Sequence, residues 1–223
     1  MPLLELHQRP QPLSRFGVLG TCAEDPSRFV THVGFNPEEH DSLAHGETLH
    51  AVHMRPPLET GGSMDVHVAA HIPLTNSEMK EMEVWMEEIA DEYADAGVKG
   101  KKNWREQYFI TPPWKDVHDN NTGVRRYRRY SCAGFVLDGH RQIDIQLLNL
   151  DALPEVGRDA IAAAYANEAG ETPDLSQLIQ FGLEGEGPWP LALPGYVIRA
   201  LDRSSEEIRS APYQAKEGDE LMP

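Results

Sequence analysis

The chemistry of this sequence is expected at Cys132, one of its two cysteines. The stretch SCAGFV predicts that a helix begins at Ser131 or Cys132, which would place the thiol at the positive end of the helix dipole and lower its pKa. Ala133 and Gly134 are small, so a substrate carbonyl could approach the backbone N–H groups of the first turn, which would form an oxyanion hole. These features predict a nucleophile at Cys132. The alternative is a buried cysteine that only fills space.

A cysteine nucleophile needs a base, and the sequence offers His32. Residues 28–36 (RFVTHVGFN) predict a β-strand on which His32 shares a face with Gly34, and this glycine would leave open space beside the imidazole. Residues 47–54 (ETLHAVHM) predict a second strand. If the two strands pair antiparallel, His32 and His50 stand side by side, so that His50 would orient the base. Two histidines with only structural roles are the alternative.

A cluster of five histidines between residues 45 and 71 could indicate a metal site. In an extended strand His50 and His53 point to opposite faces, and His67 and His71 stand about 13 Å apart, too far for one ion. No cysteine or carboxylate lies at the usual ligand spacing. We therefore expect no metal ion and no other cofactor, and a histidine-rich metal-binding protein is the less favoured alternative. The five are His45, His50, His53, His67 and His71.

The charge of the chain limits its partners. The formal net charge of −16 would repel the phosphate backbone of a nucleic acid, so we expect no nucleic-acid partner. A positive cluster, RRYRR at 125–129, stands out from this background. It indicates either attraction for an anionic group of a substrate or a solvated segment that balances the acidic helix expected at 78–95.

Further strands and helices are expected to hold this site. A third strand at 64–72 (MDVHVAAHI) would complete an antiparallel meander. Thr75 and Glu78 form a capping box for a helix that ends near Ala96, before Gly97. A short strand is expected at 108–114, before an Asn- and Asp-rich loop. Helices are expected at 131–142, 154–169 and 172–183, and a last strand at 196–201.

This pattern indicates an α+β fold in one domain. We expect an irregular N-terminal arm at 1–15, a single domain at 16–210 with a helical insertion at about 75–100, and a polar tail at 211–223. The apolar runs are only a few residues long, so no segment is expected to span a membrane. The two cysteines do not make a disulfide framework, and we expect a cytoplasmic protein of unknown oligomeric state.

Three short segments together resemble one enzyme family. SCAGFV resembles the Cys–small–Gly–Phe–Val motif of NlpC-type papain-like cysteine peptidases, THVGF resembles their His-Val-Gly strand, and TLHAV resembles the strand that follows. In the familiar members the cysteine precedes both histidines. Here the order is His32, His50, Cys132, which is similar to the circularly permuted branch that includes relatives of lecithin:retinol acyltransferase. Those relatives usually carry Asp or Asn where this chain has Ser131.

The resemblance implies a papain-like fold in permuted order, with the nucleophile at a helix N-terminus. It implies a thiol hydrolase or acyltransferase that acts on an amide or ester of a small-molecule, peptide or lipid substrate, with Cys132 as nucleophile, His32 as base and His50 as the orienting residue. Ala133, Gly134 and Gly34 would lie near the substrate. A catalytically inactive papain-like domain that binds a ligand in the same cleft is the main alternative.

Overall fold

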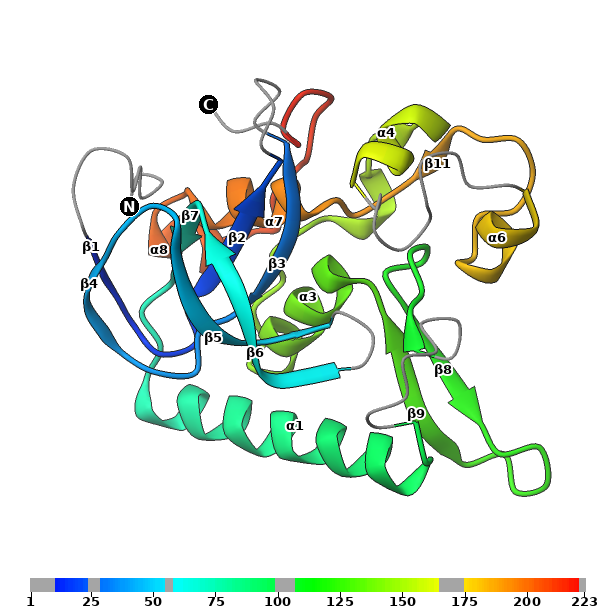
Figure 1. Ribbon diagram of the computed structural model, residues 1–223, viewed down its shortest axis with the longest axis horizontal. Helices are drawn as coiled ribbons and strands as arrows, with labels where there is room; N and C mark the ends of the chain where they lie inside the picture. The colour runs from blue at the N-terminus through cyan, green and yellow to red at the C-terminus, as the bar shows by residue number, and fades with distance from the viewer. Residues whose placement is uncertain (1–10, 24–28, 55–57, 99–106, 165–174, 221–223) are drawn as a thin grey trace.

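The computed structural model describes residues 11–23, 29–54, 58–98, 107–164 and 175–220. It is an α+β fold in which antiparallel sheets pack against helices (Figure 1). The largest sheet has five strands in the order β6-β5-β3-β2-β7, and each strand is antiparallel to its neighbour. Three two-stranded sheets, β1-β4, β8-β9 and β10-β11, complete the described strands.

The strands are β1 (Gln11–Leu13), β2 (Val18–Cys22), β3 (Val30–Phe35), β4 (His40–Leu43), β5 (Glu47–Met54), β6 (Leu58–Val66), β7 (Val68–Ala70), β8 (Trp114–His118), β9 (Arg125–Tyr130), β10 (Glu155–Val156) and β11 (Trp189–Pro190). The helices are α1 (Asn76–Asp95), α3 (Cys132–Gln142), α4 (Arg158–Ala164), α6 (Leu175–Gln180), α7 (Pro194–Leu201) and α8 (Ser205–Ser210), with a 3-10 turn at Leu150–Ala152. In these ranges, no helix has both the length and the apolar character needed to cross a membrane.

The main sheet has an apolar cluster on each face. Val18 of β2 pairs with Phe35 of β3, and both side chains face one cluster. Side chains alternate along a strand, so Leu19, the next residue of β2, faces the other cluster. The larger cluster is shared with the helices. The smaller one lies on the opposite face and consists of Leu13, Leu19, Leu43, Leu49, Ala51, Met64, Val66 and Ala69.

Helix α3 lies at the centre of the fold, between strand β3 and helix α1 (Figure 1). Aromatic rings fix it there: Phe35 of β3 makes an edge contact with Phe135, at 5.8 Å between ring centroids, and stacks on His140 at 5.5 Å. Trp85 of α1 approaches the ring of Phe135 at 5.0 Å from the other side. These contacts hold the helix that carries Cys132.

Four expected elements are confirmed. The strands expected at 28–36 and 47–54 form β3 and β5, and the helix α1 begins with the predicted capping box, in which Thr75 accepts a hydrogen bond from the backbone N–H of Glu78. Helix α3 begins at Cys132 with Ser131 as its N-cap. Local capping chemistry and hydrophobic pattern agree in each of these cases.

Residues 196–201 were expected to form a strand, and this prediction is wrong. They lie in helix α7, which begins with Pro194 in its first turn and is buried on nearly every face. A short apolar run shows no period that separates a buried helix from a buried strand.

Three other predicted elements differ in extent. The strand expected at 64–72 is divided at His67 into β6 and β7, which pair with different neighbours. The strand expected at 108–114 begins only at Trp114, and the arginine-rich segment pairs with it as β9. Helix α4 begins at Arg158, after the short strand β10, and residues 165–169 lie outside the described residues.

The two chain ends contact the body of the fold where they are described. Strand β1, within the expected N-terminal arm, pairs with β4. In the expected tail, the N–H of Tyr213 donates to the carbonyl of Leu147, at 2.8 Å. The remainder of the arm and tail, residues 1–10 and 221–223, lies outside the described residues.

The anchoring of α3 through His140 makes stability depend on pH. Burial lowers the pKa of His140 from its ordinary 6.5 to about 4, so the folded state holds this imidazole neutral. The stabilisation is complete above pH 6.5 and is lost as the pH falls towards 4, by about 3 kcal/mol. We expect urea denaturation to show a shallower loss of stability over this window in His140→Gln than in the wild type. The exposed His118, replaced by Gln, should leave the slope unchanged; an equal effect of both substitutions would contradict this origin.

Candidate functional site

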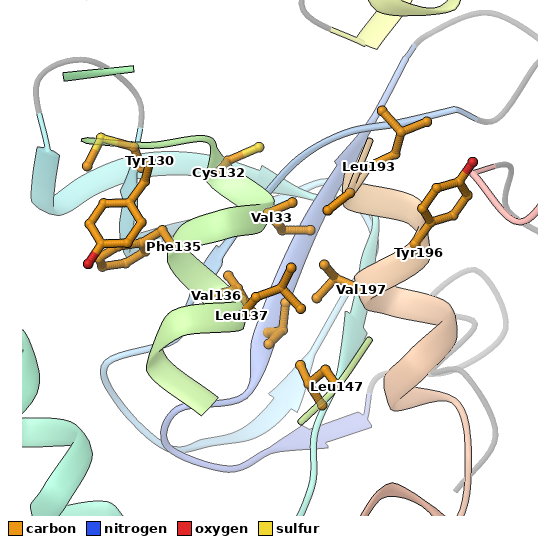
Figure 2. Packing of buried hydrophobic residues seen from close by; sticks show 14 of the residues in the cluster. Val33, Tyr130, Cys132, Phe135, Val136, Leu137, Leu147, Leu193, Tyr196 and Val197 are labelled. Carbon is orange, nitrogen blue, oxygen red and sulfur yellow. The ribbon is translucent and has the colours of Figure 1, made fainter. Parts of the chain in front are cut away.

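Cys132 is the first residue of helix α3, directly after strand β9. The side chain of Ser131 accepts a hydrogen bond from the N–H of Gly134, at 2.9 Å, and so caps the helix. Cys132 is fully buried, at 0% exposure. Figure 2 shows it at the N-terminal end of α3, with Val33 of strand β3 between helices α3 and α7.

The first turn of α3 lies tightly against the segment that precedes β8. A Cβ atom on Gly134 would lie 1.8 Å from the carbonyl oxygen of Pro113. The expectation that Gly134 leaves room for a substrate is therefore wrong: its side is filled by backbone, and its N–H is bound by Ser131. Ala133 is fully buried as well. The N–H groups that stay candidates for an oxyanion hole are those of Cys132 and Ala133.

Tyr108 contacts the thiol directly. Its hydroxyl donates to the sulfur of Cys132 at 3.9 Å, and the residue is 1% exposed. The ring makes an edge contact with Phe181, and the guanidinium of Arg129 donates to its carbonyl oxygen. A hydroxyl donor in this position favours the thiolate over the thiol. No local pattern predicts this contact, because Tyr108 is 24 residues away from Cys132 along the chain.

His32 is paired with a second histidine, His53. The Nε2 of His32 and the Nδ1 of His53 are 2.7 Å apart, and the two rings meet edge to face with centroids 4.9 Å apart. His53 lies on β5 and is 1% exposed, whereas His32 is half-buried. The expected strand pair therefore does bring two imidazoles together.

The partner of His32 was predicted to be His50, and the structure corrects this. His50 is exposed and lies opposite Ser63 of β6, on the part of β5 that does not reach β3. The prediction that His50 and His53 point to opposite sides is confirmed by their burial, but the buried member is His53. The contact between β3 and β5 is set by the pairing of Phe35 with Val52, which brings Gly34 beside His53.

Gly34 allows two strands to approach closely. A Cβ atom there would lie 2.6 Å from the Cβ of His53 and 3.1 Å from the carbonyl of Val52. The expected open space beside the imidazole of His32 is thus occupied by His53. The glycine is required because any side chain would push away the strand that carries the second imidazole.

The histidine pair and Cys132 approach β3 from different directions. Val33 and Phe35 face the helices, so alternation directs His32 to the opposite face of the strand. The register of β3 and β5 pairs Phe35 with Val52.

The arginine cluster 125–129 is engaged in contacts within the protein. Arg125 forms an ion pair with Glu92 of α1, and Arg126 donates to the carbonyl of Ala96. This agrees with the expectation that the cluster balances the acidic helix. Arg128 and Arg129 are turned inward, to carboxylates and to backbone carbonyls respectively.

The other histidines do not form a metal centre in the described part of the chain. His45 and His67 place their rings 5.0 Å apart, and the Nδ1 of His67 accepts from the N–H of Cys22 at 2.9 Å. Within the described ranges, no three side chains of His, Cys, Asp or Glu are grouped so that they could hold a metal ion.

Comparisons with known protein families, with curated protein sequences and with solved structures find no match to this chain.

The fit of Gly134 against Pro113 can be tested by one methyl group. We expect Gly134→Ala to lower the free energy of unfolding by about 1–3 kcal/mol, because the added carbon overlaps a backbone carbonyl. Alanine is otherwise the better helix former by about 1 kcal/mol, so the sign itself is informative. Gly157→Ala, where a Cβ atom meets nothing within 4 Å, is the matched control in urea denaturation. A Gly134→Ala protein as stable as the wild type would contradict the tight contact.

Proposed function

We propose that this protein is a thiol hydrolase or acyltransferase that acts on an amide or ester bond, with Cys132 as nucleophile, His32 as base and His53 in the orienting role first given to His50. The observation that carries the proposal is the contact between the Nε2 of His32 and the Nδ1 of His53. A base that is fixed by a second polar group is the arrangement that nucleophilic catalysis by a thiol requires.

One tautomer of the histidine pair would let His32 act as the base. When the Nδ1 of His53 accepts, the Nε2 of His32 carries the proton, and the Nδ1 of His32 then has a lone pair that can take the proton of a thiol. The thiolate of Cys132 attacks the carbonyl carbon, and His32 returns the proton to the leaving amine or alcohol. The acyl group, held on sulfur, passes to water or to another acceptor with loss of a proton to His32.

A papain-like fold in permuted order is part of this proposal. It is supported by a nucleophile at a capped helix N-terminus and by two histidines on neighbouring antiparallel strands earlier in the chain. Ser131 stands where the similar family carries Asp or Asn, and all three residues are good N-caps. The substrates of this class are small molecules, peptides or lipids, and we propose a cytoplasmic location.

An inactive domain that binds a ligand is the second candidate. The full burial of Cys132 and the alternation that turns His32 away from α3 favour it. The two candidates differ in one measurable property, which is the ionisation of the thiol.

The first prediction of the catalytic proposal concerns the Cys132–His32 pair. In a Cys22→Ser background, alkylation of Cys132 by iodoacetamide should follow a pKa well below the free-thiol value of about 8.5. His32→Ala should move this inflection upward by at least about one unit, because the imidazolium that stabilises the thiolate is lost. An ordinary thiol titration that ignores His32 would favour the inactive domain.

The second prediction separates the two histidines of β5. His53→Ala should lower the rate of Cys132 alkylation near neutral pH by about tenfold or more, because the imidazole of His32 loses the group that fixes its orientation and tautomer. His50→Ala removes an exposed imidazole from the same strand and should leave the rate unchanged. An equal loss in both variants would remove His53 from the site.

A further inference from the structure

The carboxylate of Asp138 lies inside the core of the protein, on helix α3, six residues after Cys132. Its side chain is 1% exposed. A buried carboxylate is costly unless hydrogen bonds and opposite charges surround it. Four side chains supply these: Arg128 at 2.9 Å, Tyr130 at 2.7 Å, Arg141 at 2.6 Å and Gln142 at 3.2 Å.

Two of these donors belong to the strand that leads into Cys132. Arg128 and Tyr130 are the fourth and sixth residues of β9, and only Ser131 separates this strand from the helix. The carboxylate of Asp138 therefore joins the chain just before the thiol to the helix just after it. The hydroxyl of Tyr93 in α1 donates to the carbonyl of Arg128, at 2.6 Å, and fixes the same strand from its other side.

The charges around Asp138 are fully engaged. The guanidinium of Arg128 binds Asp116 with two nitrogens, at 2.6 and 3.1 Å, and Asp138 with the third. This contact holds the pKa of Asp116 below its ordinary value. Arg128 and Arg141 also lie against the ring of Trp114, at 5.9 and 5.2 Å from its centroid. Arg128 is thus committed to the strand–helix junction, and it is not available to an anionic substrate.

We propose that Asp138 is a positioning residue for Cys132: by binding Arg128 and Tyr130, its carboxylate fixes the angle at which β9 enters α3 and holds the thiol beside the hydroxyl of Tyr108. This role rests on the proposed function, because the orientation of the first turn of α3 matters for chemistry only if the thiol of Cys132 reacts. Asp138 touches neither the sulfur nor a substrate. It would act through the junction, about 9 Å along the helix axis from Cys132.

The direction in which Asp138→Asn shifts the pKa of Cys132 distinguishes a positioning role from a purely electrostatic one. Loss of a negative charge in Asp138→Asn would by itself lower a thiol pKa. Loss of the junction angle moves the Tyr108 hydroxyl away from the sulfur and raises the thiol pKa. Tyr108 and Arg129, which lie near this end of α3 and titrate or carry charge, are the same in wild type and variant.

The experiment is a pH titration of thiolate absorbance near 240 nm, in full-length Cys22→Ser protein. We expect Asp138→Asn to raise the pKa of Cys132 by about one unit, and so to lower iodoacetamide alkylation at pH 7 by up to tenfold. Tyr130→Phe, which changes no charge at neutral pH, should raise the pKa in the same direction. It decides the question if Asp138→Asn does not fold.

Asp116→Asn is the matched control. It removes a carboxylate from the same guanidinium, but this carboxylate belongs to β8 and not to α3. It should lower stability in urea and leave the thiol pKa unchanged. Folded Asp138→Asn or Tyr130→Phe protein with an unchanged or lowered pKa would overturn the positioning role alone. A wild-type pKa near that of a free thiol would instead overturn the proposed function, and the positioning role with it.

Discussion

The end of helix α3 is held in place by the buried ion pair between Asp138 and Arg128, and the geometry of the candidate site follows from it. An isolated carboxylate in the core would be strongly destabilising, so the partners of Asp138 cannot move far from it. Two of these partners are residues of β9, and the chain between them and Asp138 contains Ser131, Cys132 and Gly134. The thiol is therefore placed on a constrained turn, which is capped by a serine hydroxyl and closed on one side by Pro113.

The second half of the site depends on a backbone constraint. β3 can approach β5 closely only because Gly34 has no side chain, and this approach brings the two imidazoles within 2.7 Å. The sheet thus holds a pair of imidazoles by strand packing, while capping and ionic contacts hold the thiol on the helix. The histidine pair and the capped end of α3 are built from different parts of the sequence. Strand β3 connects them, because its Val33 and Phe35 pack under α3.

Local patterns were sufficient for the elements that carry Cys132 and His32. A Ser N-cap, a capping box and β-branched strands are decided within a few residues, so helices α1 and α3 and strands β3 and β5 could be predicted. The choice between His50 and His53 could not, because it depends on which residue of β5 comes into register with Phe35, and this is set by the whole sheet. The roles of Tyr108 and Asp138 could not be predicted for a related reason, because they depend on how the folded chain packs. A single carboxylate in a helix is expected at the surface, and its four partners become visible only in the structure.

A catalytic role for Cys132 requires that a substrate reach its thiol, which is fully buried in this structure. A thiol at 0% exposure is a poor target for a substrate, and burial by itself disfavours a thiolate. The helix dipole and the hydroxyl of Tyr108 act in the opposite direction, and little water screens them. If the cysteine were only a filler, apolar neighbours would suffice, and a hydroxyl donor at the sulfur would not be needed. The structure instead places a hydroxyl donor at the sulfur, and this contact supports the proposed reaction at Cys132 over a role in packing alone.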